Sequence, residues 1–208
     1  MAGIAGLTVQ QFQDKIMGFY QTYVQDWNSW CQALRTQQNV ASMFGQILRR
    51  WQACRPNRMR RGQNEAQHDS PFLENLIVQS NQHIHALHNF DIRRQAAFNR
   101  EVRLALEELW DIFQNLCYGP AQKGVVAISK SVLLLTEGRV GPAFDSNVQR
   151  HLLLKPLNAH QWFFSLQEVS KDILAFEASN RCTLQEATPH EFAGLHSGRI
   201  YDMALGPR

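Results

Sequence analysis

"GVVAISKSVLLLTEGRVGPAFDSNVQR", residues 124–150, contains two helical patterns separated by a turn, and it has no alternating strand pattern. The first pattern runs over 125–136, and a Gly-Pro turn follows at 141–142. Asp145 then precedes a second pattern that reaches about Leu154. Aspartate is among the best helix N-cap residues, because its carboxylate accepts hydrogen bonds from the free amides of the first turn. This stretch therefore predicts two short helices, the second of which begins at Asp145.

Similar patterns extend in both directions along the chain. Apolar residues recur at spacings of three and four, which is typical of helices with one buried face. No strand pattern lasts beyond a few residues and no fixed-period repeat is present, so we predict one all-α domain of about seven to nine helices. The helices are expected at about 8–34, 39–53, 70–87, 96–117 and 159–178, in addition to the two above. The domain would span 1–208, with N-terminal helices in 8–117 and hairpin-like and C-terminal helices in 118–208.

The composition is that of a globular protein. Hydrophobic residues make up 44% of the 208 residues and charged residues 19%, which are ordinary values. The four cysteines, at 31, 54, 117 and 182, form no C-x-x-C pair, so a structural zinc or iron–sulfur site is not expected. Their wide spacing predicts mostly buried thiols in a reducing compartment.

No membrane segment or signal peptide is predicted. The N-terminus has neither a basic start nor a long apolar run. The most apolar stretch, 125–135, is interrupted at 129–131 and is shorter than the roughly 20 residues that span a bilayer. We therefore predict a cytoplasmic protein with no membrane partner.

Two segments around the Gly-Pro turn resemble the centre of a known enzyme family. "FDSNVQR", residues 144–150, is similar to a segment of the type Val-Asp-Thr-His-Val-x-Arg in the helix-hairpin-helix DNA glycosylases, with matches at Asp145, Val148 and Arg150. "KGVVAISKS", residues 123–131, resembles the Gly-Val-Gly hairpin that precedes that segment. The second hairpin glycine is replaced by Val126, and no four-cysteine cluster follows. Lys130 lies farther beyond Gly124 than the usual lysine position of the family, and the gap from Lys130 to Asp145 is a few residues shorter than in the family. The resemblance covers about residues 118–151.

The resemblance implies a DNA-binding helical fold with a site between helices. Backbone amides near Gly124 would face a DNA phosphate, with Arg150 as a further contact. The target base would leave the stack and enter a pocket. Asp145 would stabilise positive charge on the sugar or deprotonate an attacking group, and Lys130 would attack the sugar as an amine.

Both candidate catalytic residues also have simpler interpretations. Asp145 also fits the pattern of an ordinary helix cap with no further function, because aspartate is common at that position. Lys130, on a short helix, reads as a solvated side chain. The residue types alone leave both alternatives open.

A second candidate site is the basic segment "LRRWQACRPNRMRRG", residues 48–62. It contains no acidic residue, and arginine forks match the geometry of phosphate. Its alternative interpretation is a solvated loop, or arginines paired with acids elsewhere in the fold. The candidate phosphate-binding arginines are Arg49, Arg50, Arg55, Arg58, Arg60 and Arg61.

The remaining motifs indicate no metal and no cofactor. His83, His85 and His88 lie close together, but in a helix only the last two share a face, so a metal site is not predicted. The chain has no phosphate-binding loop, dinucleotide turn, nucleophile elbow or zinc-binding H-E-x-x-H motif. The C-terminal segment is expected to dock onto the body through Ile200, Met203 and Leu205, with no chemical role.

Three functional hypotheses follow from these features. The first is a DNA-binding helical protein, either a glycosylase-like enzyme or an inactive relative. The second is a protein-interaction or structural domain with a protein partner, and the third is an enzyme that acts on a small metabolite near Asp145. The oligomeric state is not predicted.

Overall fold

The computed structural model describes residues 3–53, 70–117 and 124–207, and within these ranges every regular element is helical. The predicted all-α class is thereby confirmed. The elements are α1 (Val9–Met17), α2 (Gln21–Thr36), α3 (Val40–Arg50), α4 (Ser70–Ala86), η1 (Gln95–Ala97), α5 (Arg100–Phe113), α6 (Val125–Leu135), α7 (Ser146–Leu152), α8 (Ala159–Asn180), α9 (Leu184–Ala187), η3 (His190–Phe192) and α10 (Ser197–Leu205).

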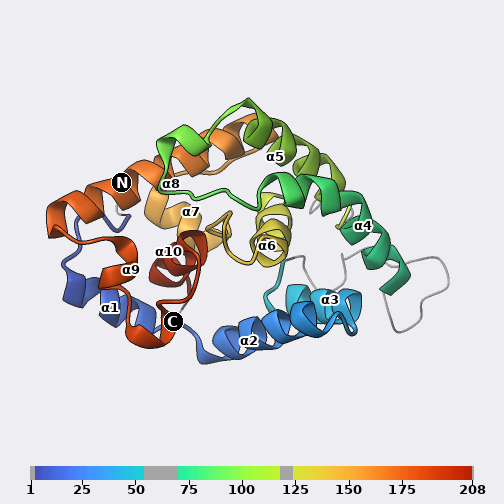
Figure 1. The fold of residues 1–208 in the computed structure, drawn as a ribbon, viewed down its shortest axis with the longest axis horizontal. Coiled ribbons are helices and arrows are strands. Elements are labelled where there is room, and N and C mark those ends of the chain that lie inside the picture. Colours follow the sequence, from blue (N-terminus) through green and yellow to red (C-terminus); the bar gives the residue numbers. More distant parts are fainter. Residues whose placement is uncertain (1–2, 54–69, 118–123, 208) are drawn as a thin grey trace.

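The helices form a ring around a helical centre (Figure 1). Going round the ring, α2 packs on α3, α3 on α4, α4 on α5, α5 on α8, α8 on α9 and α9 on α1. Helices α6, α7 and α10 lie inside it: α6 contacts α3 and α5, while α10 contacts α1 and α7. The central helices are therefore covered by neighbours from both halves of the sequence.

Helices α6 and α10 are buried almost all round. In α10 every residue is buried, and in α6 nine of the ten positions from Val125 to Leu134 are buried, Val126 being the exception. Burial of polar groups is costly unless they are hydrogen-bonded. The hydroxyls of Ser129 and Ser131 donate to the carbonyls of Val125 (2.6 Å) and Ala127 (2.9 Å), so these serines are compatible with the core.

Local capping explains several of the helix starts. Thr8 forms a capping box with Gln11 at α1, and Asn158 accepts a hydrogen bond from the amide of Gln161 at α8. Both caps were predicted from the sequence.

The first predicted helix is wrong in its length. The stripe expected over 8–34 forms two helices, because the chain turns at Gly18–Tyr20. There the Tyr20 amide donates to the carbonyl of Pro207 (3.1 Å), a contact with the other end of the chain. A local periodicity cannot reveal such a contact.

The turn after α6 crosses the start of α10 at very short distance. Gly138 has a φ of 84°, which favours glycine, and its carbonyl accepts a hydrogen bond from the Arg199 amide (3.0 Å). A Cβ atom added at Gly198 would lie 2.6 Å from the oxygen of Gly138 and 2.7 Å from the nitrogen of Gly141. This crossing fixes α10 against the segment that leads to α7, and it includes the cis Gly141–Pro142 peptide bond.

Replacing Gly198 with alanine tests this crossing. Because the new methyl group would meet backbone atoms that cannot rotate away, we expect the free energy of unfolding to fall by about 2–3 kcal/mol. The control is Gly194→Ala, where nothing lies within 4 Å of the added atom. Urea unfolding should leave the control near wild type, and equal stability of the two variants would contradict the close approach.

The cysteine and membrane predictions have different outcomes. The prediction of buried thiols is wrong for Cys117, which is disulfide-bonded, while Cys31 and Cys182 are free but only half-buried. Cys54 lies outside the described residues. Among the helices that the structure describes, none has the length and apolarity needed to cross a bilayer.

Candidate functional site

Asp145 caps α7 with one carboxylate oxygen and faces α6 with the other. Its Oδ1 accepts hydrogen bonds from the amides of Asn147 (2.9 Å) and Val148 (3.1 Å). Its Oδ2 lies 4.0 Å from the Nζ of Lys130, and the Asp145 side chain is 16% exposed. The cap interpretation of Asp145 therefore holds geometrically, but the residue also forms an ion pair at the interior end of the helix.

Lys130 is buried, so the interpretation of this lysine as a solvated side chain is wrong. The residue is 5% exposed, and its amine donates a hydrogen bond to the carbonyl of Trp51 at the end of α3. Burial lowers the pKa of Lys130, whereas Asp145 and Asp202 act to raise it and Arg199 acts to lower it further. A buried lysine with a lowered pKa is more readily deprotonated, which is the condition for an amine nucleophile.

The segment that leads to Asp145 is held by buried side chains. The amide of Ala143 donates to Oδ1 of Asp202 (2.9 Å), and the amide of Phe144 donates to Oγ of Ser129 (2.8 Å). These contacts join α10 and α6 to the N-terminus of α7. The position of the Asp145 carboxylate is therefore set by tertiary structure as well as by its own helix.

Among the residues that the structure describes, Arg199 is the largest fully buried charged side chain. It is 1% exposed, and its Nη1 donates to Oδ2 of Asp202 at 2.6 Å. Its guanidinium carbon lies 4.9, 4.6 and 5.2 Å from the ring centroids of Phe19, Trp27 and Trp51. Burial lowers the pKa of Arg199, and the contact with Asp202 opposes that effect. Arginine stacks well on aromatic faces, so the charge is compensated from several sides.

Sequence reasoning assigned no role to Arg199 and Asp202. The two residues stand at i and i+3 within an otherwise apolar segment, "SGRIYDMAL". That spacing places an arginine and an aspartate on one face of a helix. The pattern was present, but burial of the whole segment was not predicted.

The arginine-rich candidate site is only partly described. Arg49 is half-buried, and Arg50 forms an ion pair with Asp26 (2.6 Å), whose other oxygen accepts a hydrogen bond from the Trp51 indole (3.0 Å). One predicted phosphate contact is thus paired with a buried acid, as the alternative interpretation allowed. Arg55, Arg58, Arg60 and Arg61 lie outside the described residues.

The other predicted DNA contacts lie at the ends of the central helices. Gly124 is the N-cap of α6 and is partly exposed, while Arg150 is exposed in the last turn of α7. Asp145 and Arg150 therefore stand at opposite ends of α7.

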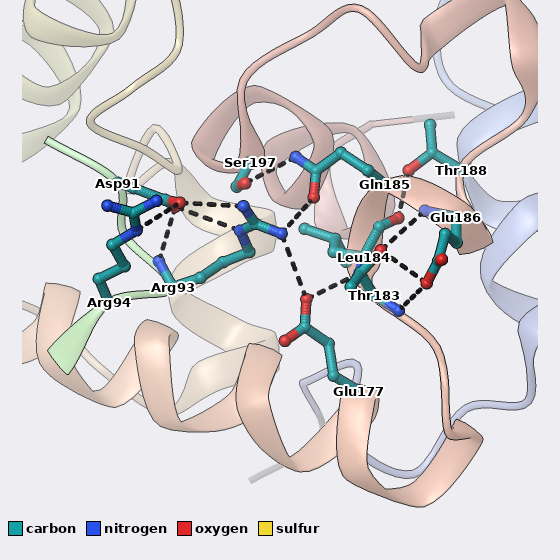
Figure 2. A network of polar contacts seen from close by, with 10 residues as sticks. All are labelled: Asp91, Arg93, Arg94, Glu177, Thr183, Leu184, Gln185, Glu186, Thr188 and Ser197. Carbon is teal, nitrogen blue, oxygen red and sulfur yellow. Dashed lines mark hydrogen bonds and ion pairs between the residues drawn. The ribbon is translucent and has the colours of Figure 1, made fainter. Parts of the chain in front are cut away.

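A second polar network joins the loop after α4 to the C-terminal helices (Figure 2). Arg93 contacts both carboxylate oxygens of Asp91 (3.2 and 2.9 Å), and its Nη1 donates to Oε1 of Gln185 (2.7 Å). Gln185 in turn donates to Ser197 (2.9 Å), the first residue of α10. Burial raises the pKa of Asp91, but the hydrogen bonds from Arg93 outweigh it and lower that pKa overall. This network supports α10 from the side of α9.

The histidine cluster shows no site among the residues that the structure describes. The rings of His85 and His88 stack with centroids 5.8 Å apart, which fits the shared face expected from their spacing. No group of three or more potential metal ligands was found in the described ranges.

A cavity of about 260 Å³ opens between α2 and the C-terminal part of the chain. Arg199, Trp27 and Phe192 are among its lining residues, and Lys130 and Asp145 are not. This cavity therefore gives no support to a small-metabolite site built on Asp145.

Comparisons with protein-family models, with curated proteins and with solved structures yield no match to this chain.

Proposed function

We propose that this chain is a DNA-binding helical protein of the helix-hairpin-helix glycosylase type, with Lys130 as the nucleophile and Asp145 as its partner carboxylate. The observation that carries the proposal is the distance of 4.0 Å between the Lys130 amine and the Asp145 carboxylate. The family that the sequence resembles has an aspartate at the position of Asp145 and sometimes a catalytic lysine near the start of the preceding helix. Lys130 lies beyond that lysine position in the sequence. Asp145 follows Lys130 by fifteen positions in the sequence, so their approach is a property of the fold.

The chemistry follows from the two groups. The neutral amine of Lys130 would attack C1′ of the damaged nucleotide, so that a C–N bond forms while the glycosidic bond breaks and the base leaves with its electron pair. The Asp145 carboxylate would accept the proton that the alkylated amine releases. Since Lys130 is 6% exposed at its side chain and Asp145 16%, the nucleotide would approach from the side of Asp145.

Phosphate binding is assigned to Arg49, Arg55, Arg58, Arg60 and Arg61, with Gly124 and Arg150 as further contacts. Arg50 is left out because it is paired with Asp26. The basic segment, residues 48–62, includes Trp51, whose carbonyl accepts a hydrogen bond from the Lys130 amine. This contact supports the assignment, because Trp51 belongs to the basic segment and also binds the proposed nucleophile.

Two measurements on one substrate test the function. The substrate is a short duplex with a single abasic site, because its ring-opened aldehyde reacts with an amine to form an imine that borohydride reduces. We expect a covalent protein–DNA adduct. We also expect affinity to rise by about 100-fold when salt falls from about 200 to about 50 mM, which corresponds to about four phosphate contacts.

The possible outcomes separate the hypotheses. Salt-dependent binding without an adduct would identify an inactive DNA-binding relative. Absence of binding at both salt concentrations would reject the proposal altogether.

A second candidate function, protein binding, is favoured by one surface. Leu153, Leu157 and Phe164 are exposed large apolar residues, with exposures of 78%, 68% and 47%. Leu153 and Phe164 also line a depression of about 280 Å³ between α7 and α8. Grouped exposed apolar residues are typical of interaction surfaces. A partner retained after nuclease treatment, and lost on Leu153→Ser, would support this candidate.

A further inference from the structure

Asp202 connects α10 to the segment that carries Asp145. One of its oxygens accepts the hydrogen bond from the Ala143 amide (2.9 Å), and the other accepts from Arg199 (2.6 Å). Ala143 lies two residues before Asp145, and the amide of Asp145 donates to the Ala143 carbonyl (2.9 Å). A displacement of Asp202 would therefore be transmitted to the capping carboxylate.

Arg199 reaches the other member of the candidate pair. Its guanidinium packs on the ring of Trp51, 5.2 Å from the centroid, and the carbonyl of Trp51 accepts the hydrogen bond from Lys130. The Trp51 indole also donates a hydrogen bond to Asp26 (3.0 Å). The carbonyl that accepts from the lysine amine thus belongs to a residue that is held by both Arg199 and Asp26.

We infer that Arg199 and Asp202 form a positioning pair, which keeps the Lys130 amine and the Asp145 carboxylate at their observed positions relative to each other. The inference rests on the proposed function for what the amine does, and it assigns a role to two residues that touch neither substrate nor reacting atoms. Groups that act on a substrate need support of this kind, because small displacements cost large factors in rate. The close crossing at Gly138, Gly141 and Gly198 also helps to position Asp145, since it fixes the start of α10 on the turn before Asp145.

The charges around Lys130 define a specific signature. Asp145 faces the amine from the start of α7, and Asp202 and Arg199 face it from α10. Burial raises the pKa of Tyr23 on α2. The negative charges of Asp145, Asp26 and Asp202 raise that pKa further. Because the negative charge of Asp202 raises the pKa of Lys130, its removal should lower that pKa.

The variant Asp202→Asn separates positioning from general stability. We expect the acid limb of the pH profile for adduct formation on abasic DNA to move down by about 1 pH unit. We also expect the plateau rate to fall by about tenfold, because the Ala143 amide and Arg199 lose an ionised acceptor. Asp202→Glu keeps the charge, so it should keep the acid limb of the wild type and lower only the plateau.

The matched control is Asp172→Asn. Asp172 is also a buried carboxylate attached to α10, through the Tyr201 hydroxyl (2.7 Å), and it accepts from the Ile4 amide (2.6 Å). It is not among the charges that act on Lys130. The control should lose stability without a shift in the pH profile. A profile that shifts equally in both variants would reduce the effect of Asp202 to stability and overturn the inference.

A second readout needs no DNA. The chain has five lysines, and NMR of ¹³C-labelled lysine can follow the titration of Lys130 in the wild type and the variants. A lower pKa for Lys130 in Asp202→Asn supports the inference even if the wild type forms no adduct, in which case only the proposed function fails. An unchanged pKa overturns the inference, whatever the DNA experiment gives. Should Asp202→Asn not fold, Asp202→Glu decides: a plateau rate and lysine pKa both equal to wild type would overturn it.

Discussion

Replacing Arg199 with methionine is expected to lower the free energy of unfolding by about 3–5 kcal/mol, because it leaves a buried carboxylate without its partner. Asp202 is 6% exposed and receives its charged hydrogen bond from Arg199 at 2.6 Å. Methionine fills part of the volume but cannot donate to Asp202 or present a cation to the three aromatic rings. Urea unfolding followed by circular dichroism measures the loss.

Two companion variants make this result specific. Arg35→Met removes an exposed arginine from the last turn of α2, and it should change stability by less than about 0.5 kcal/mol. Arg199→Met combined with Asp202→Asn removes both charges, and it should recover part of the loss, since no unpaired charge is left in the core. If Arg199→Met were as stable as Arg35→Met, the pair would contribute nothing to the fold.

Lys130→Met is expected to reduce adduct formation on abasic DNA by at least about 10³-fold, since the variant removes the nucleophile itself. The methionine side chain is close in length to that of lysine, so the variant should remain folded. The rate is measured by borohydride trapping at several times, with duplex affinity measured in parallel. Affinity should stay near that of the wild type, because phosphate contact is assigned to arginines.

Matched variants separate the chemical role from simpler explanations. Lys171→Met changes an exposed lysine, with a side-chain exposure of 63%, and should leave the adduct unchanged. Asp145→Asn keeps a good N-cap residue but removes the charge, so it should preserve stability and slow the adduct by about 10²-fold. A normal rate in Asp145→Asn would leave Asp145 with its capping role alone.

Features determined by neighbouring residues were predictable from the sequence. The caps at Thr8 and Asn158, and the capping geometry of Asp145, depend on a side chain and on amides two or three residues away. These capping hydrogen bonds join residues that are close in the sequence, so the sequence pattern alone predicts them. The separation of the predicted helix at Gly18–Tyr20 depends instead on the Pro207 carbonyl, and no local pattern contains that information.

The interior charges show where sequence reasoning fails. Lys130 was open to interpretation as a solvated residue because its own helix does not reveal that the end of α3 and the start of α7 lie against its amine. Helix α10 was itself missed, since a segment buried all round has no polar face and therefore no amphipathic period. Arg50 is a similar case, because its partner Asp26 lies on another helix and net charge does not report such pairing.

The site of adduct formation tests the central claim most directly. After borohydride reduction of the complex with abasic DNA, nuclease digestion and proteolysis, mass spectrometry locates the modified lysine among the five in the chain. We predict that the modification lies on Lys130. A modification on Lys15, Lys123, Lys155 or Lys171 instead, or an unmodified chain, would contradict the account of Lys130 and Asp145 as a catalytic pair.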